Sequence, residues 1–134
     1  MNYWLLKSEP DTFSWEMLEK TNPSMWDGVR NYQARNNLRK MTAGDQAIFY
    51  YSGKNPGIIG LTEIVKEHYP DPTAAEGDWS AVDVKAIRRF KKIISLQEIK
   101  QISLLQNMVL VKNTRLSVQP VTKEEFEFIM KLGD

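Results

Sequence analysis

The stretch IIGLTEIVKEHY, residues 58–69, predicts a long β-strand that ends at Pro70. Its apolar residues fall on both faces, because side chains alternate from one face of a strand to the other. Gly60 interrupts the apolar run, and a glycine inside a strand indicates a bend or a bulge. We therefore expect a small sheet that curves at this point.

Further strands extend this sheet. QAIFYYS, residues 46–52, predicts a strand with apolar side chains that can pack on both faces. WSAVDVKAIRRF, residues 79–90, predicts another, in which apolar and charged positions alternate. Two more strands are expected, in the aromatic-rich opening Tyr3–Ser8 and in RLSVQPV, residues 115–121. This makes five expected strands, and Pro120 lies at the end of the last one.

Capping signals mark most of the expected helices. Ser14 is a good N-cap, and Phe13 and Leu18 are spaced as a hydrophobic staple, so a helix should begin there. This helix should end near Lys20. A second helix is indicated by a narrow apolar stripe at helical spacing, formed by Ala34, Leu38 and Met41.

Two capping boxes predict two later helices. Ser95 with Glu98 opens one, and Thr122 with Glu125 opens the other, which should end at Gly133. Between them, LLQNMVLVKN, residues 104–113, could be helix or strand.

The order of these elements places the chain in the α+β class, as a mixed sheet that carries helices on its outside. A chain of 134 residues without repeats or a linker predicts one domain, residues 1–134. Cysteine is absent, which excludes disulfides and thiolate chemistry, and we expect no metal and no cofactor. No cationic leader and no membrane-spanning segment is visible, so we expect a cytoplasmic monomer that does not contact a membrane.

Charge is unevenly distributed along a chain whose formal net charge is only +1. One basic block runs through residues 30–40 and another through residues 85–92, and a mostly acidic stretch separates them. Such blocks suit a phosphate backbone on one side of the molecule, and they equally suit ordinary solvated faces.

Few groups are placed for catalysis. His68 is the only histidine, so a Ser-His-Asp arrangement depends on it alone, and no phosphate-binding glycine motif occurs. Lys7, Ser8 and Glu9 place a cation, a hydroxyl and a carboxylate together, and Lys7 could act as a base if buried. An ordinary strand end beside a turn is the simpler interpretation of that triplet.

The tryptophans are more informative. Trp4 and Trp15 lie inside strand and helix patterns, where packing accounts for them. Trp26 and Trp79 lie in polar or turn-rich junctions, where an indole could stack on a planar ring while nearby polar groups read its edge. Core packing would also explain either of these two.

Five motifs in fixed order carry a resemblance: YWLLKSEP, WDGVRNYQARN, PGIIGLTEIVKEHYPD, WSAVDV and RLSVQPVT. In these the chain resembles the EVE domain, the module of the thymocyte nuclear protein family and its bacterial relatives, from Tyr3 to about Met130. The resemblance implies a PUA-like fold, in which a mixed sheet curls into a partial barrel with a pocket at one opening. The EVE domain is similar to the YTH domain, which holds a methylated base in an aromatic cage.

The resemblance further implies a non-catalytic module that accommodates a methylated or otherwise substituted base of DNA or RNA in an aromatic-lined pocket. Trp26 and Trp79 would be facing walls of that pocket. The other base-binding positions would be Lys7, Ser8, Asn31, Tyr32, Tyr51, Ser52, Ser117 and Gln119. Arg30, Arg35 and Arg39 are placed to meet the flanking phosphates.

Two other functions stay open. Some PUA-like relatives hydrolyse an acyl group from a modified nucleoside, and Lys7 would be the centre of such an amidohydrolase-like activity. A protein-interaction module with a vestigial pocket is the third possibility. The sequence does not distinguish DNA, RNA and a free nucleoside as the ligand.

Overall fold

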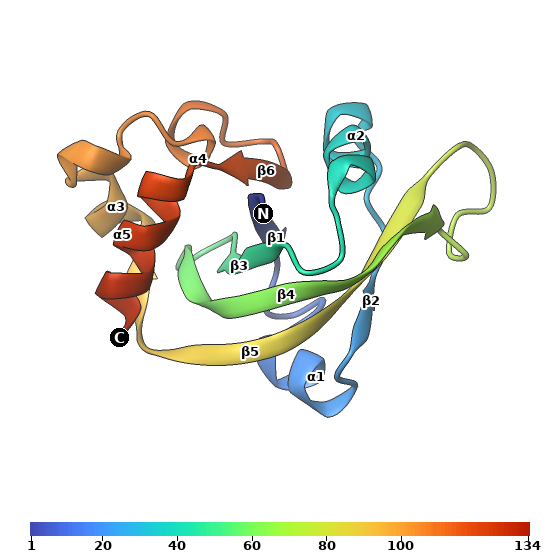
Figure 1. Ribbon diagram of the computed structural model, residues 1–134, viewed down its shortest axis with the longest axis horizontal. Helices are drawn as coiled ribbons and strands as arrows, with labels where there is room; N and C mark the ends of the chain where they lie inside the picture. Colours follow the sequence, from blue (N-terminus) through green and yellow to red (C-terminus); the bar gives the residue numbers. More distant parts are fainter.

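Six strands form one sheet in the spatial order β2-β5-β4-β3-β1-β6 in a computed structural model of residues 1–134 (Figure 1). The strands are β1 (Tyr3–Ser8), β2 (Ser24–Trp26), β3 (Gln46–Tyr51), β4 (Gly57–Pro70), β5 (Ser80–Ser95) and β6 (Val118–Val121). β1 pairs in parallel with β3, and every other neighbouring pair is antiparallel. The sheet is therefore mixed, and the predicted α+β class is confirmed.

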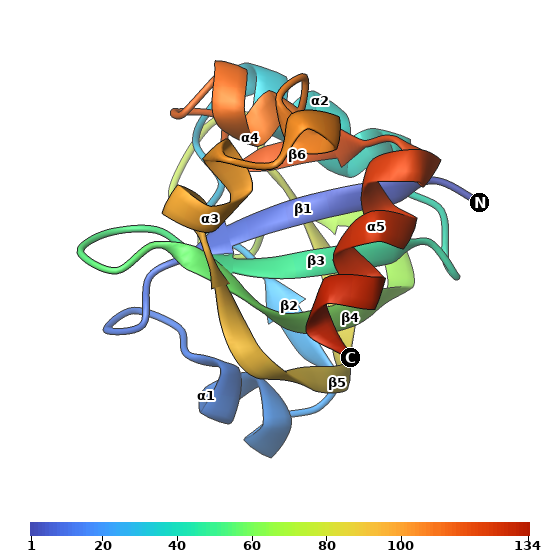
Figure 2. The ribbon, with the colours of Figure 1, turned by 90° about the vertical axis from the view of Figure 1, so that its left-hand side faces the viewer.

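The helices lie around the outside of this sheet (Figures 1 and 2). They are α1 (Trp15–Lys20), α2 (Tyr32–Lys40), α3 (Leu96–Lys100), the short 3₁₀ helix η1 (Ser103–Leu105), α4 (Val109–Lys112) and α5 (Lys123–Gly133). In Figure 1, α3, α4 and α5 gather at one end, and α2 lies beside the other end of the long β4–β5 hairpin. None of these helices is long and apolar enough to cross a lipid bilayer.

The two faces of β3 serve two separate cores, as the alternation of QAIFYYS predicted. Ala47 and Phe49 belong to one core, together with Trp15 of α1. Ile48 and Tyr50 belong to a second core, which includes residues of α3, α4 and α5. The two cores form because successive side chains of a strand point to opposite faces of the sheet.

The predicted bend at Gly60 is confirmed, and close packing explains it. The pairing of β4 with β5 shifts register between Ile58 and Gly60. A Cβ atom at Gly60 would lie 2.6 Å from the carbonyl oxygen of Arg88 and 2.9 Å from Cη2 of Trp15. Only a glycine lets the neighbouring strand and the indole approach this closely.

The predicted helix caps are confirmed with one exception. The Ser14 hydroxyl accepts a hydrogen bond from the amide of Met17, and the Thr122–Glu125 box is complete. At Ser95 only half of the predicted box forms, because its hydroxyl accepts from Glu98 N but the Glu98 side chain makes no return bond.

Other boundaries differ from the sequence expectations. β2 was not predicted, because three residues are too short to display a period, and it forms only by pairing with β5. β5 runs on to Ser95, beyond its predicted end. Pro120 lies inside β6, which is an edge strand and therefore tolerates a residue without an N–H.

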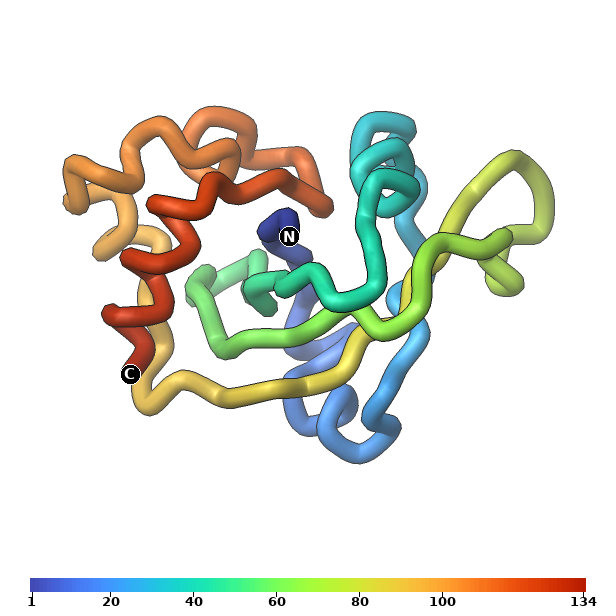
Figure 3. The backbone as a smooth tube through the Cα atoms, viewed as in Figure 1, coloured from blue at the N-terminus to red at the C-terminus, as the bar shows by residue number.

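The loop between β4 and β5, residues 71–79, occupies the far end of the hairpin. Figure 3 traces it in yellow-green where it turns back beside α2. This position brings the loop to the segment between β2 and α2.

Candidate functional site

A cavity of about 680 Å³ opens where the ends of β1 and β2 meet several loops. It is lined by Lys7, Ser8, Glu9, Thr12, Phe13, Met25, Trp26, Asp27, Gly28, Val29, Arg30, Asn31, Ser52, Thr114, Arg115 and Ser117. Seven residues with a predicted role are therefore brought together here: Lys7, Ser8, Trp26, Arg30, Asn31, Ser52 and Ser117. Strand ends and loops position them, as is common for binding sites on a rigid scaffold.

Lys7 lies at the end of β1 and is tied to the segment before β6. Its backbone N–H donates to the carbonyl of Ser117 at 2.9 Å, and its Nζ donates to the carbonyl of Thr114 at 2.8 Å. Burial lowers the pKa of the Lys7 ammonium from its ordinary value of 10.5, because desolvation disfavours the charged form. The amine is thus a fixed donor at the cavity surface.

The two serines join the neighbouring loops to the end of β1. The Ser8 hydroxyl donates to the carbonyl of Phe13 at 2.6 Å. The backbone N–H of Ser52 donates to the carbonyl of Ser8 at 2.8 Å. The oxygen of each hydroxyl keeps lone pairs that can accept a hydrogen bond from a ligand.

Trp26 is the rigid aromatic wall of the cavity. Its side chain is only 6% exposed, and its ring packs edge-on against Phe13 at 5.8 Å and Phe49 at 5.7 Å between centroids. T-shaped contacts of this kind hold aromatic rings in defined orientations. Little of the indole is open to solvent, so what it presents to the cavity is a fixed surface.

Asn31 connects the cavity to α2. It is the N-cap of that helix, and its side-chain oxygen accepts a hydrogen bond from the amide of Ala34 at 2.9 Å. This bond uses the carbonyl oxygen of the side-chain amide, and the NH₂ group donates to no protein atom. The side-chain NH₂ is therefore available as a donor.

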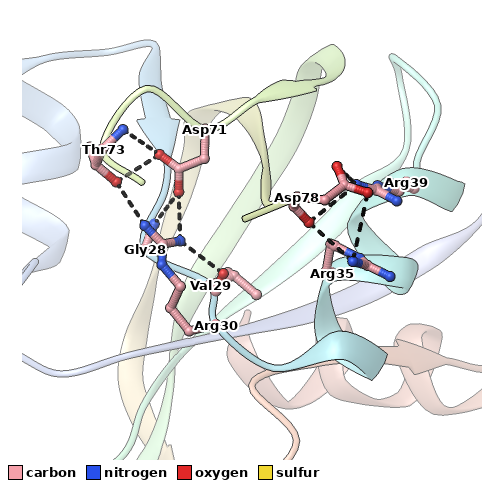
Figure 4. A network of polar contacts seen from close by, with 8 residues as sticks. All are labelled: Gly28, Val29, Arg30, Arg35, Arg39, Asp71, Thr73 and Asp78. Atoms are coloured by element: carbon pink, nitrogen blue, oxygen red, sulfur yellow. Dashed lines mark hydrogen bonds and ion pairs between the residues drawn. The ribbon is translucent and has the colours of Figure 1, made fainter. Parts of the chain in front are cut away.

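Asp71 binds the segment between β2 and α2, residues 27–31, here called the cavity loop (Figure 4). Its carboxylate, whose side chain is 0% exposed, accepts 2.9 Å hydrogen bonds from Gly28 N and from Nη1 of Arg30. The Thr73 amide and hydroxyl donate to its other oxygen at 2.8 and 2.7 Å. Burial alone would raise the pKa of Asp71, but these hydrogen bonds outweigh it and lower the pKa to about 2.

Charged groups of both signs surround the cavity. Lys7, Arg30 and Arg115 supply cations, whereas Glu9 and Asp27 supply carboxylates. Burial raises the pKa of Asp27, and the negative charge of Asp71 adds to that rise. The cavity therefore offers both donors and acceptors to a ligand edge.

Trp79 does not line the cavity, which corrects the predicted pair of facing walls. Its indole stacks instead on the ring of Tyr32, with centroids 5.0 Å apart and planes inclined by 18°. Tyr32 does not line the cavity either. Trp79 is absent from the cavity because the 71–79 loop places it beside α2 and not beside the end of β2.

Two further predicted residues have structural partners instead of cavity positions. The Tyr51 hydroxyl accepts a 2.7 Å hydrogen bond from the backbone N–H of Trp15. Gln119 is 0% exposed, and its side-chain amide donates to the carbonyl of Leu116 at 2.8 Å. Both residues therefore support the core around the cavity.

The predicted phosphate contacts are also separated by the structure. Arg30 lies at the cavity, but Arg35 and Arg39 bind Asp78 of the 71–79 loop (Figure 4). Arg39 Nη2 lies 2.7 Å from Oδ1 of Asp78, and Arg35 Nη1 lies 3.9 Å from Oδ2. These two guanidiniums already have an anionic partner.

Sequence reasoning missed Arg115, Asp27 and Asp71. Arg115 is exposed and lines the cavity without an ion-pair partner. It begins the motif RLSVQPVT, but the segment was expected to be a strand from residue 115, and β6 begins only at Val118. Its neighbours in the cavity are far away in sequence. Asp27 adjoins Trp26, so its place in a motif with an aromatic wall could have drawn attention to it.

Comparison with known proteins identifies the family. The family model of the EVE domain matches residues 2–132. Mouse (Mus musculus) thymocyte nuclear protein 1 is 46% identical over 168 aligned positions, which cover 99% of this chain and 74% of the mouse protein. A protein from Agrobacterium tumefaciens is 43% identical and superimposes with a TM-score of 0.95 over 99% of this chain and 93% of that chain.

Among the similar solved structures are two complexes with nucleic acid. The human THYN1 protein in complex with DNA containing 5-methylcytosine is 43% identical, with a TM-score of 0.90 over 100% of this chain and 98% of that chain. The YTH domain of Zygosaccharomyces rouxii MRB1, in complex with N6-methyladenosine RNA, has a TM-score of 0.59 and 17% identity over 98% of this chain and 83% of that chain. The second likeness concerns the fold alone.

The mixed sheet, its outer helices and the cavity at one end define an α+β domain of the PUA-like class. Within that class, the chain belongs to the EVE domain family, together with thymocyte nuclear protein 1 and bacterial structural relatives.

Proposed function

We propose that the chain is a non-catalytic nucleic-acid-binding module that holds a substituted base, with 5-methylcytosine in DNA as the first candidate, in the cavity beside Trp26. The observation that carries the proposal is the cavity itself, which is lined by the fixed indole of Trp26, by Phe13 packed against it, and by many polar groups. The human relative that is 43% identical and binds DNA containing 5-methylcytosine supports this choice of ligand.

The size and chemistry of the cavity suit a single base. Its volume of about 680 Å³ lies within the ordinary range for small-ligand pockets. An indole contacts the base ring, while Lys7, Asn31 and Ser117 offer polar atoms to its edge. A base inside a duplex must leave the stack to reach such a pocket.

Energetics decide what each part of the site contributes. Stacking stabilises a bound base by about 1–3 kcal/mol, and extrusion from a duplex costs a few kcal/mol, so these terms nearly cancel. Burying one methyl group adds only about 0.8 kcal/mol, which is less than tenfold in affinity. A rigid wall must therefore provide the discrimination, and cationic groups without an ion-pair partner, such as Arg115, must supply much of the binding.

Trp26→Phe tests the proposal, because it trims the wall but keeps an aromatic core residue. Fluorescence anisotropy should compare two duplexes that differ only in one 5-methylcytosine. The wild-type chain should bind the methylated duplex more tightly, and the variant should lose most of that preference. Binding of both duplexes should weaken as salt rises, because phosphate contacts release counterions.

Trp4→Phe is the matched control. Trp4 is 5% exposed, close to the 6% of Trp26, but it does not line this cavity. It should keep the preference for the methylated duplex. Equal affinity of the wild-type chain for both duplexes would contradict the choice of ligand, and no binding to either would contradict the proposal as a whole.

A hydrolase centred on Lys7 is the alternative, and one observation favours it. Burial lowers the pKa of Lys7 within the same cavity as Ser8, and a more neutral amine is a better base or nucleophile. An acylated nucleoside should then be converted to the free nucleoside by the wild-type chain and not by Lys7→Met. We propose that no such product forms.

A further inference from the structure

Tyr32 and Trp79 form an aromatic pair outside the cavity, here called the outer stack. The two rings lie nearly parallel, with centroids 5.0 Å apart. Tyr32 is the first residue of α2, and Trp79 ends the loop between β4 and β5. The cavity function described above uses neither ring.

Tyr32 is unusually open to water. Its residue is 67% exposed, and it is the only aromatic among the large exposed apolar residues. Trp79, by contrast, is half-buried. The stack thus covers one face of the tyrosine ring and leaves most of its remaining surface free. Its exposed ring offers a planar π-face on which another ring can stack.

The outer stack is rigid although it is exposed. A Cβ atom at Gly77 would lie only 2.7 Å from Nε1 of Trp79, so the loop backbone packs against the indole edge. The guanidinium of Arg35 lies 5.0 Å from the centroid of Tyr32, and that of Arg30 lies 5.6 Å from the centroid of Trp79. A pre-positioned ring loses little conformational entropy on binding.

The outer stack also adjoins the cavity. Arg30 and Asn31 line the cavity, and Tyr32 is the next residue in the chain. The Arg30 side chain reaches from the cavity to Trp79. The outer stack therefore begins directly beside the residues that line the cavity.

We propose that the free face of Tyr32 is a second base-binding subsite, which stacks on the base next to the one in the cavity. This inference rests on the proposed function. The ligand is any nucleobase on the same strand, because every base has a π-face and stacking does not read the edge. The guanidiniums of Arg30 and Arg35 lie beside the two rings. Because each is also paired with a carboxylate, of Asp71 or Asp78, they hold the rings in place rather than supply free charge. Selection for the substituent stays with the cavity, and the outer stack adds affinity.

The test uses Tyr32→Ala and Tyr32→Phe with duplexes that contain one 5-methylcytosine. In matched probes, the nucleotide on its 5′ side or its 3′ side is replaced by an abasic unit. The wild-type chain should bind an intact probe about tenfold more tightly than the probe that is abasic on the stacked side. Tyr32→Phe should keep that ratio because it keeps the ring, and Tyr32→Ala should reduce it to about one.

Two ratios separate this inference from the proposed function. Tyr32→Ala should leave the ratio of methylated to unmethylated affinity unchanged, whereas Trp26→Phe should lower that ratio and keep the abasic effect. A purely structural role predicts that Tyr32→Ala lowers thermal stability and that the folded variant keeps the abasic effect, which would overturn the inference. Failure of the wild-type chain to bind any probe would overturn both.

Discussion

The carboxylate of Asp71 lies 2.9 Å from the guanidinium of Arg30, and no part of that carboxylate side chain is exposed. Because the same oxygen also binds the amide of Gly28, the pair fixes both the backbone and one cation of the cavity loop. The strength of this arrangement can be measured through its pH dependence.

Asp71→Asn should destabilise the fold by about 2 kcal/mol at pH 7, since a pKa lowered from 3.8 to about 2 corresponds to that free energy. A carboxylate whose pKa is lower in the folded state stabilises it fully above about pH 4. That contribution is lost as the pH falls toward 2. The difference between wild type and variant in urea denaturation should therefore shrink over this window.

Asp11→Asn is the control for that experiment. Asp11 is exposed and forms no ion pair, so its variant should follow the wild-type curve within about 0.5 kcal/mol. A difference for Asp71→Asn that stays constant from pH 7 to pH 2 would show that the charge of Asp71 is not what stabilises the loop.

Asp78→Asn should increase affinity for DNA without changing the preference for a methylated base. Asp78 occupies the guanidiniums of Arg35 and Arg39, and its loss releases them toward phosphates. Each new phosphate contact should steepen the dependence of log affinity on log salt by about 0.9. A salt titration of anisotropy measures this slope. Glu76→Gln, in the same loop and without an ion pair, should leave it unchanged.

Gly60→Ala should destabilise the fold by about 1–3 kcal/mol, as expected for overpacking. The new methyl group would meet the carbonyl of Arg88, which belongs to a paired strand and cannot move aside cheaply. Chemical denaturation gives the value. A variant as stable as wild type would mean that β5 shifts freely at this point.

Glu125→Ala should cost more than Glu98→Ala, although the sequence predicts a capping box at both sites. The Glu125 side chain accepts a hydrogen bond from the backbone N–H of Thr122, whereas the Glu98 side chain returns no such bond to Ser95. We expect a loss of about 0.5–1.5 kcal/mol at Glu125 and of less than about 0.5 kcal/mol at Glu98. Equal losses in thermal denaturation would indicate that the return bond of Glu125 contributes nothing.

The features that the sequence predicted well are local. The Thr122 box joins residues three positions apart, and the alternation of β3 is visible in seven letters. The Gly60 bend is marked by the glycine itself, although Arg88 and Trp15, which pack against it, are far away in sequence. The stack of Trp79 on Tyr32 joins positions far apart in sequence, so no local pattern could distinguish it from a wall facing Trp26. Lys7 and Trp26, which the family resemblance assigned to one pocket, line one cavity in the structure. The resemblance could not foresee the path of the 71–79 loop.

Because the sheet has a core on each face, the two cores are coupled during unfolding. β3 contributes Phe49 to one core and Ile48 to the other. Because the two cores share this strand, we expect them to unfold together. A destabilising substitution in the core beneath α5 should therefore also loosen Trp26, which belongs to the other core. The domain should thus behave as a single cooperative unit, and its ligand should protect even the most distant amides from exchange.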